Sequence, residues 1–157
     1  MQFNSRGYPF HRGRRLRSSK SLRDLVAESF LKTDDLVMPY FVREENDEAL
    51  IKKMPGIRRF SESELIHELG EISKLGIKAI SLFPKIPDEK KTHDACESYN
   101  ENNLVCRLLK KISKEFPDLI TICDVALDAY TETGHDGITN SKGKIENDQT
   151  IKILEKI

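Results

Sequence analysis

The sequence has no long apolar run and no surplus of charge of one sign. No stretch approaches the roughly 20 apolar residues that cross a membrane, and the start lacks the apolar core of a secretory signal. The 26 basic and 26 acidic side chains balance, so no whole-chain field draws the protein to nucleic acid or to a membrane. We therefore expect a cytoplasmic protein that binds neither.

Cysteine is also scarce, with three residues at Cys96, Cys106 and Cys123. Their separations of ten and seventeen positions fit neither a zinc knuckle with paired Cys-x-x-Cys nor an even-numbered disulfide framework. Cys106 falls in a helical pattern and Cys123 near the end of a predicted strand, where cysteine usually packs as a small apolar side chain. We expect three reduced thiols with structural roles.

The first twenty residues form a basic segment, since they hold six arginines and lysines and the first acid is Asp24. We predict an arm over residues 1–20, for which composition leaves two explanations open. It is a solvated terminus or a transit peptide of the Arg- and Ser-rich mitochondrial kind. Phe3, Tyr8 and Phe10 do not supply the stacked aromatics of a nucleic-acid module.

From residue 21 the apolar pattern alternates between helix and strand periods. Helices are predicted over 21–30, 61–75, 104–116 and 147–157, and strands over 36–42, 77–83 and 119–125. The strand starts lie about forty residues apart, the spacing of parallel strands joined by right-handed helical crossovers. The pattern predicts an α/β fold with a parallel sheet.

Local signals mark the ends of several of these elements. Ser61 and Glu64 form a capping-box pattern, and Gly76 supplies a helix stop. Asn147 and Asp148 are predicted to cap the last helix, and Pro39 weakens the first strand because it removes a backbone donor. Three parallel strands alone leave two open edges, so we expect the chain to be poorly stable or prone to aggregation by itself.

The loop after the third predicted strand carries the candidate chemistry. Asp124 follows the strand, and Asp128 and Asp136 lie further along with two glycines that let the loop fold back. Ligands bind at the carboxyl ends of strands in parallel α/β folds. A cluster of carboxylates favours Mg²⁺ over zinc. The plain alternative is that aspartate and glycine are ordinary loop residues.

Several motifs occur together in a characteristic order. They are Arg14-Arg15-Leu16-Arg17, Met54-Pro55-Gly56, Leu82-Phe83-Pro84, Asp124-Val125-Ala126-Leu127-Asp128, Gly134-His135-Asp136-Gly137 and Asn147-Asp148. In this order they resemble porphobilinogen synthase, also called 5-aminolevulinate dehydratase. That family is a (β/α)₈ TIM barrel behind an amino-terminal arm, and such barrels need about 250 residues. The resemblance implies the arm and then, over 21–157, the first part of a truncated barrel.

The resemblance implies a hydro-lyase that condenses two 5-aminolevulinate molecules into porphobilinogen, with loss of two waters, in tetrapyrrole and haem biosynthesis. It implies Asp124 as a catalytic carboxylate near two Schiff-base lysines that would follow residue 157, so the 157-residue chain is expected to be inactive alone. It also implies a homo-oligomer, an octamer for the full-length protein. Arg14, Arg15 and Arg17 would then contact a neighbouring subunit.

The resemblance also bears on the metal. Ala126, Asp128 and Asp136 match three cysteines that hold zinc in the zinc-type members. The Ala/Asp/Asp pattern is that of aspartate-rich members associated with Mg²⁺, which implies Asp128 and Asp136 as magnesium ligands and no catalytic zinc. At Ala95-Cys96 the family usually has Gly-Ser, in a segment that the resemblance implies is an active-site lid. Loss of that glycine is expected to stiffen the lid.

Two alternatives to this enzyme stay open. The first is a non-catalytic fragment that acts as an oligomer-interaction segment. The second is another lysine-dependent barrel, such as an aldolase, which the same strand-helix spacing would allow. An aldolase would not explain the aspartate loop and the arm together. Lys85 follows the second predicted strand and offers an amine for Schiff-base chemistry, but a surface position is its plainer interpretation.

Overall fold

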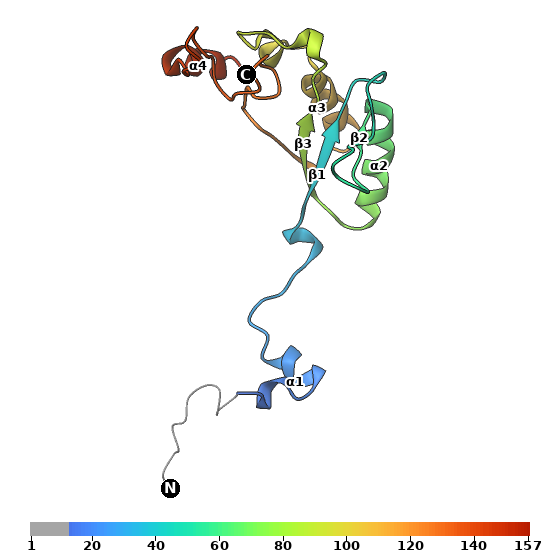
Figure 1. The fold of residues 1–157 in the computed structure, drawn as a ribbon. Coiled ribbons are helices and arrows are strands. Elements are labelled where there is room, and N and C mark those ends of the chain that lie inside the picture. The colour runs from blue at the N-terminus through green and yellow to red at the C-terminus, as the bar shows by residue number, and fades with distance from the viewer. Residues whose placement is uncertain (1–12) are drawn as a thin grey trace, which may run out of the picture. The chain divides into compact units, whose positions relative to one another are not determined.

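The computed structural model describes residues 13–157, which divide into two units (Figure 1). The first unit ends at Lys32 and the second begins at Thr33. Residues 1–12 of the predicted arm lie outside the described residues, and the arm's boundary at residue 20 stays a prediction. Within residues 13–157, no helix combines the length and the apolar character needed to span a membrane.

The first unit contains two short helical segments. A 3-10 turn, η1 (Arg15–Arg17), precedes helix α1 (Lys20–Leu25). The Ser19 hydroxyl accepts a hydrogen bond from the Leu22 amide at 3.1 Å, as expected of a small polar cap. The helix predicted over 21–30 is wrong in length, because α1 ends at Leu25. Neither helical segment of this unit buries a side chain, and Phe30 is 71% exposed, so no packing extends the helix.

A parallel sheet of four strands, in the order β2-β1-β3-β4, forms the second unit. The strands are β1 (Val37–Val42), β2 (Arg59–Phe60), β3 (Ala79–Pro84) and β4 (Ile120–Cys123). The helices are α2 (Glu62–Lys74), α3 (Leu104–Glu115) and α4 (Asn147–Leu154), with 3-10 turns η2 (Thr33–Asp35), η3 (Asp88–Lys90) and η4 (Cys96–Tyr99). The predicted α/β pattern is confirmed.

The expectation of only three strands is wrong, because a fourth, β2, pairs with the end of β1. It has two residues, too few to show a period-2 pattern in the sequence. It pairs only with Phe41 and Val42. Pro39 therefore has a strand partner on one side only, Ser81 of β3, which is where a sheet tolerates proline.

The main core lies between one face of the sheet and helices α2 and α3 (Figure 1). Alternate residues of β1 and β3 point to that face. The buried members of this core are Tyr40, Val42, Leu65, Leu69, Ile72, Ile80, Leu82, Leu104, Leu108 and Ile112. Since both helices supply every third or fourth residue to it, their amphipathic patterns fix them on the same side of the sheet.

The opposite face of the sheet is open. Val37, Ile120 and Ile122 are 48%, 60% and 42% exposed. The rings of Phe41 and Phe83 pack against each other on this face with centroids 5.9 Å apart, and both are half-buried. In a closed barrel this face would be the interior.

The ends of the later helices agree in part with the sequence signals. Gly76 follows the C-terminal cap of α2 with φ of +80°. The prediction that Asn147 and Asp148 cap α4 is wrong, since both lie inside its first turn and no side chain caps it. The cause is the Glu146 amide, which donates to the Ile138 carbonyl at 2.7 Å and places Glu146 at the cap position.

Glu64 joins the capping box of α2 to two arginines. Its carboxylate accepts from the Ser61 amide at 2.8 Å and pairs with Arg43 and Arg58, each at 2.9 Å. The Ser61 hydrogen bond, helped by the two guanidinium charges, lowers the pKa of Glu64 below its ordinary value of 4.5.

Because the folded pKa of Glu64 lies below the unfolded one, its ionised form stabilises the fold above pH 4.5. That contribution is lost as the pH falls through the depressed folded pKa. We expect Glu64→Gln to lower the urea concentration at the midpoint of unfolding at neutral pH. The difference between the midpoints of wild type and variant should shrink as the pH falls from ~5 to ~3. A difference that stays constant over this range would contradict the linkage.

Candidate active site

A cavity of about 440 Å³ lies at the carboxyl ends of β1, β3 and β4. Phe41, Phe83 and Cys123 line it from the strand ends, and the segments that follow β3 and β4 supply much of the remaining surface. Cavities of roughly 300–1,000 Å³ hold small-molecule ligands. In parallel α/β folds such ligands bind at this end of the strands. The position and size make this cavity the candidate active site.

Two of the three predicted aspartates reach the cavity. Asp124 directly follows β4, and Asp128 comes four residues later. Both side chains are exposed and both line the cavity. The sequence placed Asp124 correctly at a strand end. The catalytic role of Asp124 and the metal-binding role of Asp128 stay predictions.

Asp136 is held elsewhere, by the loop itself. Its Oδ1 accepts a hydrogen bond from the Leu127 backbone amide at 2.6 Å, and it is not among the residues that line the cavity. Leu127 is fully buried in a second apolar cluster with Ile86, Ala95, Tyr130 and Ile138. Asp136 therefore pins the aspartate loop onto this cluster.

The described residues do not by themselves fit a metal ion. Among residues 13–157, no group of three or more histidine, cysteine, aspartate and glutamate side chains lies close enough to hold one. One carboxylate oxygen of Asp136 accepts the hydrogen bond from Leu127, which leaves fewer oxygens for a cation. Mg²⁺ takes six oxygen ligands in octahedral geometry, several of them water. The carboxylates here would be only part of such a site.

Replacement of Asp136 should separate its structural contact from its charge. Asp136→Asn keeps an oxygen that can accept from the Leu127 amide, whereas Asp136→Ala leaves that amide without its acceptor, at a cost of about 1–3 kcal/mol. We expect the Leu127 amide to exchange with deuterium faster in the alanine variant and to stay close to wild type in the asparagine variant. Equal protection in all three proteins would show that the contact does not hold the loop.

Tyr130 and Cys123 give the cavity two neutral polar groups. Burial, the largest cause, raises the pKa of Tyr130 to about 12, with nearby acidic groups adding to the shift. Burial and then the charge of Asp124 raise the pKa of the Cys123 thiol. Both groups stay protonated at neutral pH, so Cys123 is a poor nucleophile. All three cysteines are unpaired, as predicted.

The sequence did not identify two other residues of the cavity, Tyr99 and Lys156. The Lys156 ammonium lies 4.9 Å from the centre of the Tyr99 ring, and both side chains line the cavity. Such a contact is a cation–π interaction. Tyr99 lies in the segment after Ala95-Cys96, whereas Lys156 reaches the cavity only through the return of the chain after β4, for which no sequence pattern gives a signal.

The backbone near the cavity is strained at Ala95. This buried residue has φ of +51°, in the left-handed region that favours glycine. It precedes η4, whose Ser98 and Tyr99 line the cavity. The methyl group packs in the cluster that also buries Leu127. The expected stiffening of this segment by alanine, and its movement as a lid, both stay predictions.

Other candidate residues make ordinary contacts or are exposed in their own unit. Lys85 pairs with Asp47 at 3.0 Å and does not line the cavity. Arg14, Arg15 and Arg17 are exposed in the first unit. Their contact with a neighbouring subunit stays a prediction.

Comparison with known proteins adds independent information. The family model for delta-aminolevulinic acid dehydratase matches residues 10–157. The Bradyrhizobium diazoefficiens delta-aminolevulinic acid dehydratase is 40% identical over 144 residues, and the Methanothermus sociabilis one is 43% identical over 151 residues. These alignments cover 91% and 96% of the chain but only 40% and 46% of the two relatives. The chain spans less than half the length of either relative.

A solved structure matches at the level of the fold. The Toxoplasma gondii delta-aminolevulinic acid dehydratase, or porphobilinogen synthase, was crystallised with the reaction product porphobilinogen. It superposes with a TM-score of 0.87 at 43% identity, over 93% of this chain and 42% of its own. This match and the four parallel strands confirm the predicted fold, an α/β arrangement equivalent to the first part of a TIM barrel.

Proposed function

The chain belongs to the delta-aminolevulinic acid dehydratase family, and from that premise we propose that it is part of a porphobilinogen synthase. This hydro-lyase condenses two molecules of 5-aminolevulinate into porphobilinogen, with loss of two waters, in tetrapyrrole and haem biosynthesis. The observation that carries the proposal is the family match over residues 10–157. The cavity at the carboxyl ends of β1, β3 and β4 supports it.

We propose Asp124 as the catalytic carboxylate. It lies in the cavity directly after β4, where a carboxylate can hold the ammonium group of an amino acid or move a proton. The Schiff-base lysines must be neutral to attack a ketone, and Lys85 is paired with Asp47. We propose that these lysines come from the part of the protein that its relatives have and this chain does not cover, so the chain is inactive alone.

We propose Mg²⁺ as the metal, and no catalytic zinc. Support comes from the residue types, since Asp128 and Asp136 offer carboxylate oxygens, whereas zinc would favour thiolate or imidazole. We assign no reaction step to the ion, because the described residues do not form a complete site.

The full-length protein is proposed to be a cytoplasmic homo-oligomer, an octamer, in which Arg14, Arg15 and Arg17 contact a neighbouring subunit. Guanidinium groups suit this role because they grip carboxylates through two parallel hydrogen bonds. All three side chains are exposed. The relatives from Glycine max and Oryza sativa are named chloroplastic, so location varies within the family.

The test is porphobilinogen formation from 5-aminolevulinate by the full-length protein that carries this chain. We expect turnover by wild type and a loss on the order of 10²–10⁴-fold in kcat for Asp124→Asn. Glu132→Gln is the matched control, because Glu132 is an exposed acid of the same loop that does not line the cavity. An inactive wild type would overturn the proposed reaction, and full activity of Asp124→Asn would overturn its role.

A further inference from the structure

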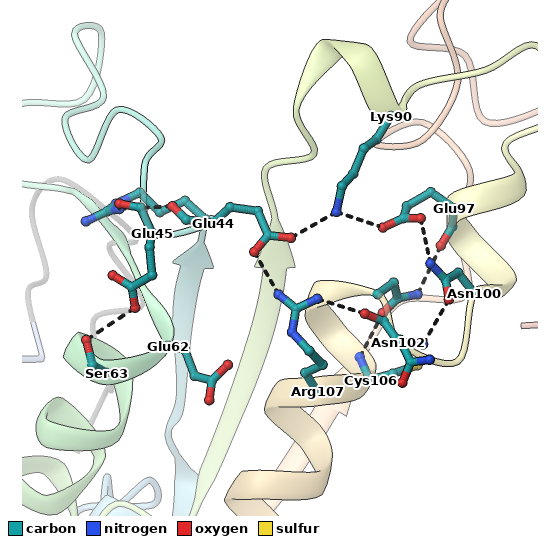
Figure 2. Close-up of polar contacts among 12 residues, drawn as sticks. Glu44, Glu45, Glu62, Ser63, Lys90, Glu97, Asn100, Asn102, Cys106 and Arg107 are labelled. Carbon is teal, nitrogen blue, oxygen red and sulfur yellow. Dashed lines mark hydrogen bonds and ion pairs between the residues drawn. The ribbon is translucent and has the colours of Figure 1, made fainter.

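Glu44 lies two residues past β1 and joins segments that are far apart in the sequence (Figure 2). Its Oε1 accepts from the Lys90 ammonium at 3.1 Å, and its Oε2 accepts from the Arg107 guanidinium at 2.7 Å. Lys90 belongs to η3, which follows β3, and Arg107 belongs to α3. One carboxylate therefore ties the segment after β1 to two later parts of the chain.

Lys90 extends this contact toward the cavity. Its ammonium also donates to Glu97 Oε1 at 3.2 Å, and Glu97 Oε2 accepts from the Asn100 amide group at 2.8 Å (Figure 2). Glu97 lies in η4. We call residues 96–101 the cavity wall, because Ser98, Tyr99, Asn100 and Glu101 of this segment line the cavity. A continuous line of charged contacts thus runs from Glu44 to the cavity wall.

These ion pairs are shielded from solvent in part. The side chains of Glu97, Glu44 and Lys90 are 13%, 27% and 39% exposed. Salt screens partly buried pairs much less than exposed ones. The hydrogen bond from Lys90 to Glu44, followed by that to Glu97, raises the pKa of Lys90, so the ammonium stays charged. The line of contacts is therefore present at neutral pH.

The cavity wall needs such support. It begins after Ala95, whose positive φ stores strain. Asn103 donates to the carbonyls of Glu97 and Ser98 at 3.2 and 3.1 Å. The Lys110 ammonium of α3 donates to the Glu101 carbonyl at 3.0 Å, and the Cys96 amide donates to the Thr92 hydroxyl at 3.1 Å. Lys90 adds, from the η3 side, the charged contact with the Glu97 side chain.

We propose that Glu44 is a positioning residue that, through Lys90 and Glu97, holds the cavity wall in place for substrate binding. Loss of the Glu44 charge frees Lys90 on one side, and the wall then opens more often. The positioning concerns the cavity itself, and its effect on turnover rests on the proposed function.

Hydrogen exchange of the cavity wall tests the positioning directly. In the full-length protein that carries this chain, we expect Glu44→Gln to raise the exchange rate of the amides of residues 97–101 by about tenfold. Lys90→Met should raise it similarly, and the double variant should add little more, because both changes break the same line of contacts. Amides of the central turns of α2 should keep the wild-type rate.

Glu62→Gln is the matched control. Glu62 pairs with Lys111 at 3.0 Å across the same side of the fold, with a similar exposed fraction, but makes no contact with the wall. Its removal should leave exchange of residues 97–101 unchanged. Unchanged exchange in Glu44→Gln, or an equal rise in Glu62→Gln, would overturn the proposal.

Kinetics of the same variants connect the wall to binding. We expect Glu44→Gln to raise KM for 5-aminolevulinate about tenfold with a smaller change in kcat. Absence of turnover in wild type would overturn the proposed function while the exchange result still decides the positioning role. A change in kcat alone, with KM and wall exchange at wild-type values, would overturn the positioning role and leave the proposed function standing.

Discussion

Replacing Leu69 by alanine is expected to cost about 2–5 kcal/mol of unfolding free energy. Leu69 lies in α2, is fully buried, and packs in the main core between that helix, α3 and the sheet. The truncation removes apolar contact area and leaves a cavity that the rigid strands cannot fill. Urea unfolding followed by circular dichroism measures the loss, with the slope of the transition showing whether the unfolded state has changed.

Leu75 provides the control on the same helix. It is the C-terminal cap residue of α2 and is 67% exposed, so Leu75→Ala should change stability by about 0.5 kcal/mol or less. Similar losses for Leu69→Ala and Leu75→Ala would mean that α2 does not cover the sheet with the face described.

The open face of the sheet limits how much unfolding free energy the chain can lose and still fold. Val37, Ile120 and Ile122 remain between 42% and 60% exposed on the side away from the core. Burial of such side chains contributes about 1.5–3 kcal/mol each in a complete fold. The expectation that the chain is poorly stable alone stays a prediction, but these exposures give its physical cause.

The parts of the fold that the sequence predicted are those governed by local rules. Periodic apolar positions located α2 and α3, and the Ser61–Glu64 capping box marked where α2 begins. The two-residue strand β2 was missed because its pairing depends on β1 and not on any pattern of its own. The cap of α4 was misplaced for a similar reason, since the Ile138 carbonyl fixes the position of Glu146.

In the candidate site, too, local sequence rules predicted some residues and missed the contacts that depend on the assembled fold. A strand end followed by a polar loop was enough to place Asp124 in the cavity. The Asp136 contact with the Leu127 amide depends on how the loop closes, and the Glu44 contact with Lys90 joins residues 46 positions apart. Such contacts are consequences of the assembled sheet, so the spacing of residues in the sequence does not reveal them.

Arg43 is expected to be the most costly charged residue to remove, with Arg43→Met losing about 3 kcal/mol. Its side chain is 8% exposed and pairs with Glu64 at 2.9 Å. The same guanidinium donates to the carbonyls of Glu44 and Glu45 at 3.0 and 2.6 Å. Methionine fills much of the volume but leaves these oxygens without their donor, and each buried acceptor left unpaired destabilises the fold.

Arg58→Met is the matched control, because Arg58 pairs with the same Glu64 carboxylate at 2.9 Å but is 46% exposed. Even with its contact to the Phe60 ring, its loss should cost about 1 kcal/mol or less. Urea unfolding at neutral pH measures both variants, and equal losses would show that burial of Arg43 does not matter. Since Arg43 also fixes the backbone of Glu44, Arg43→Met should speed exchange in the cavity wall, whereas Arg58→Met should not.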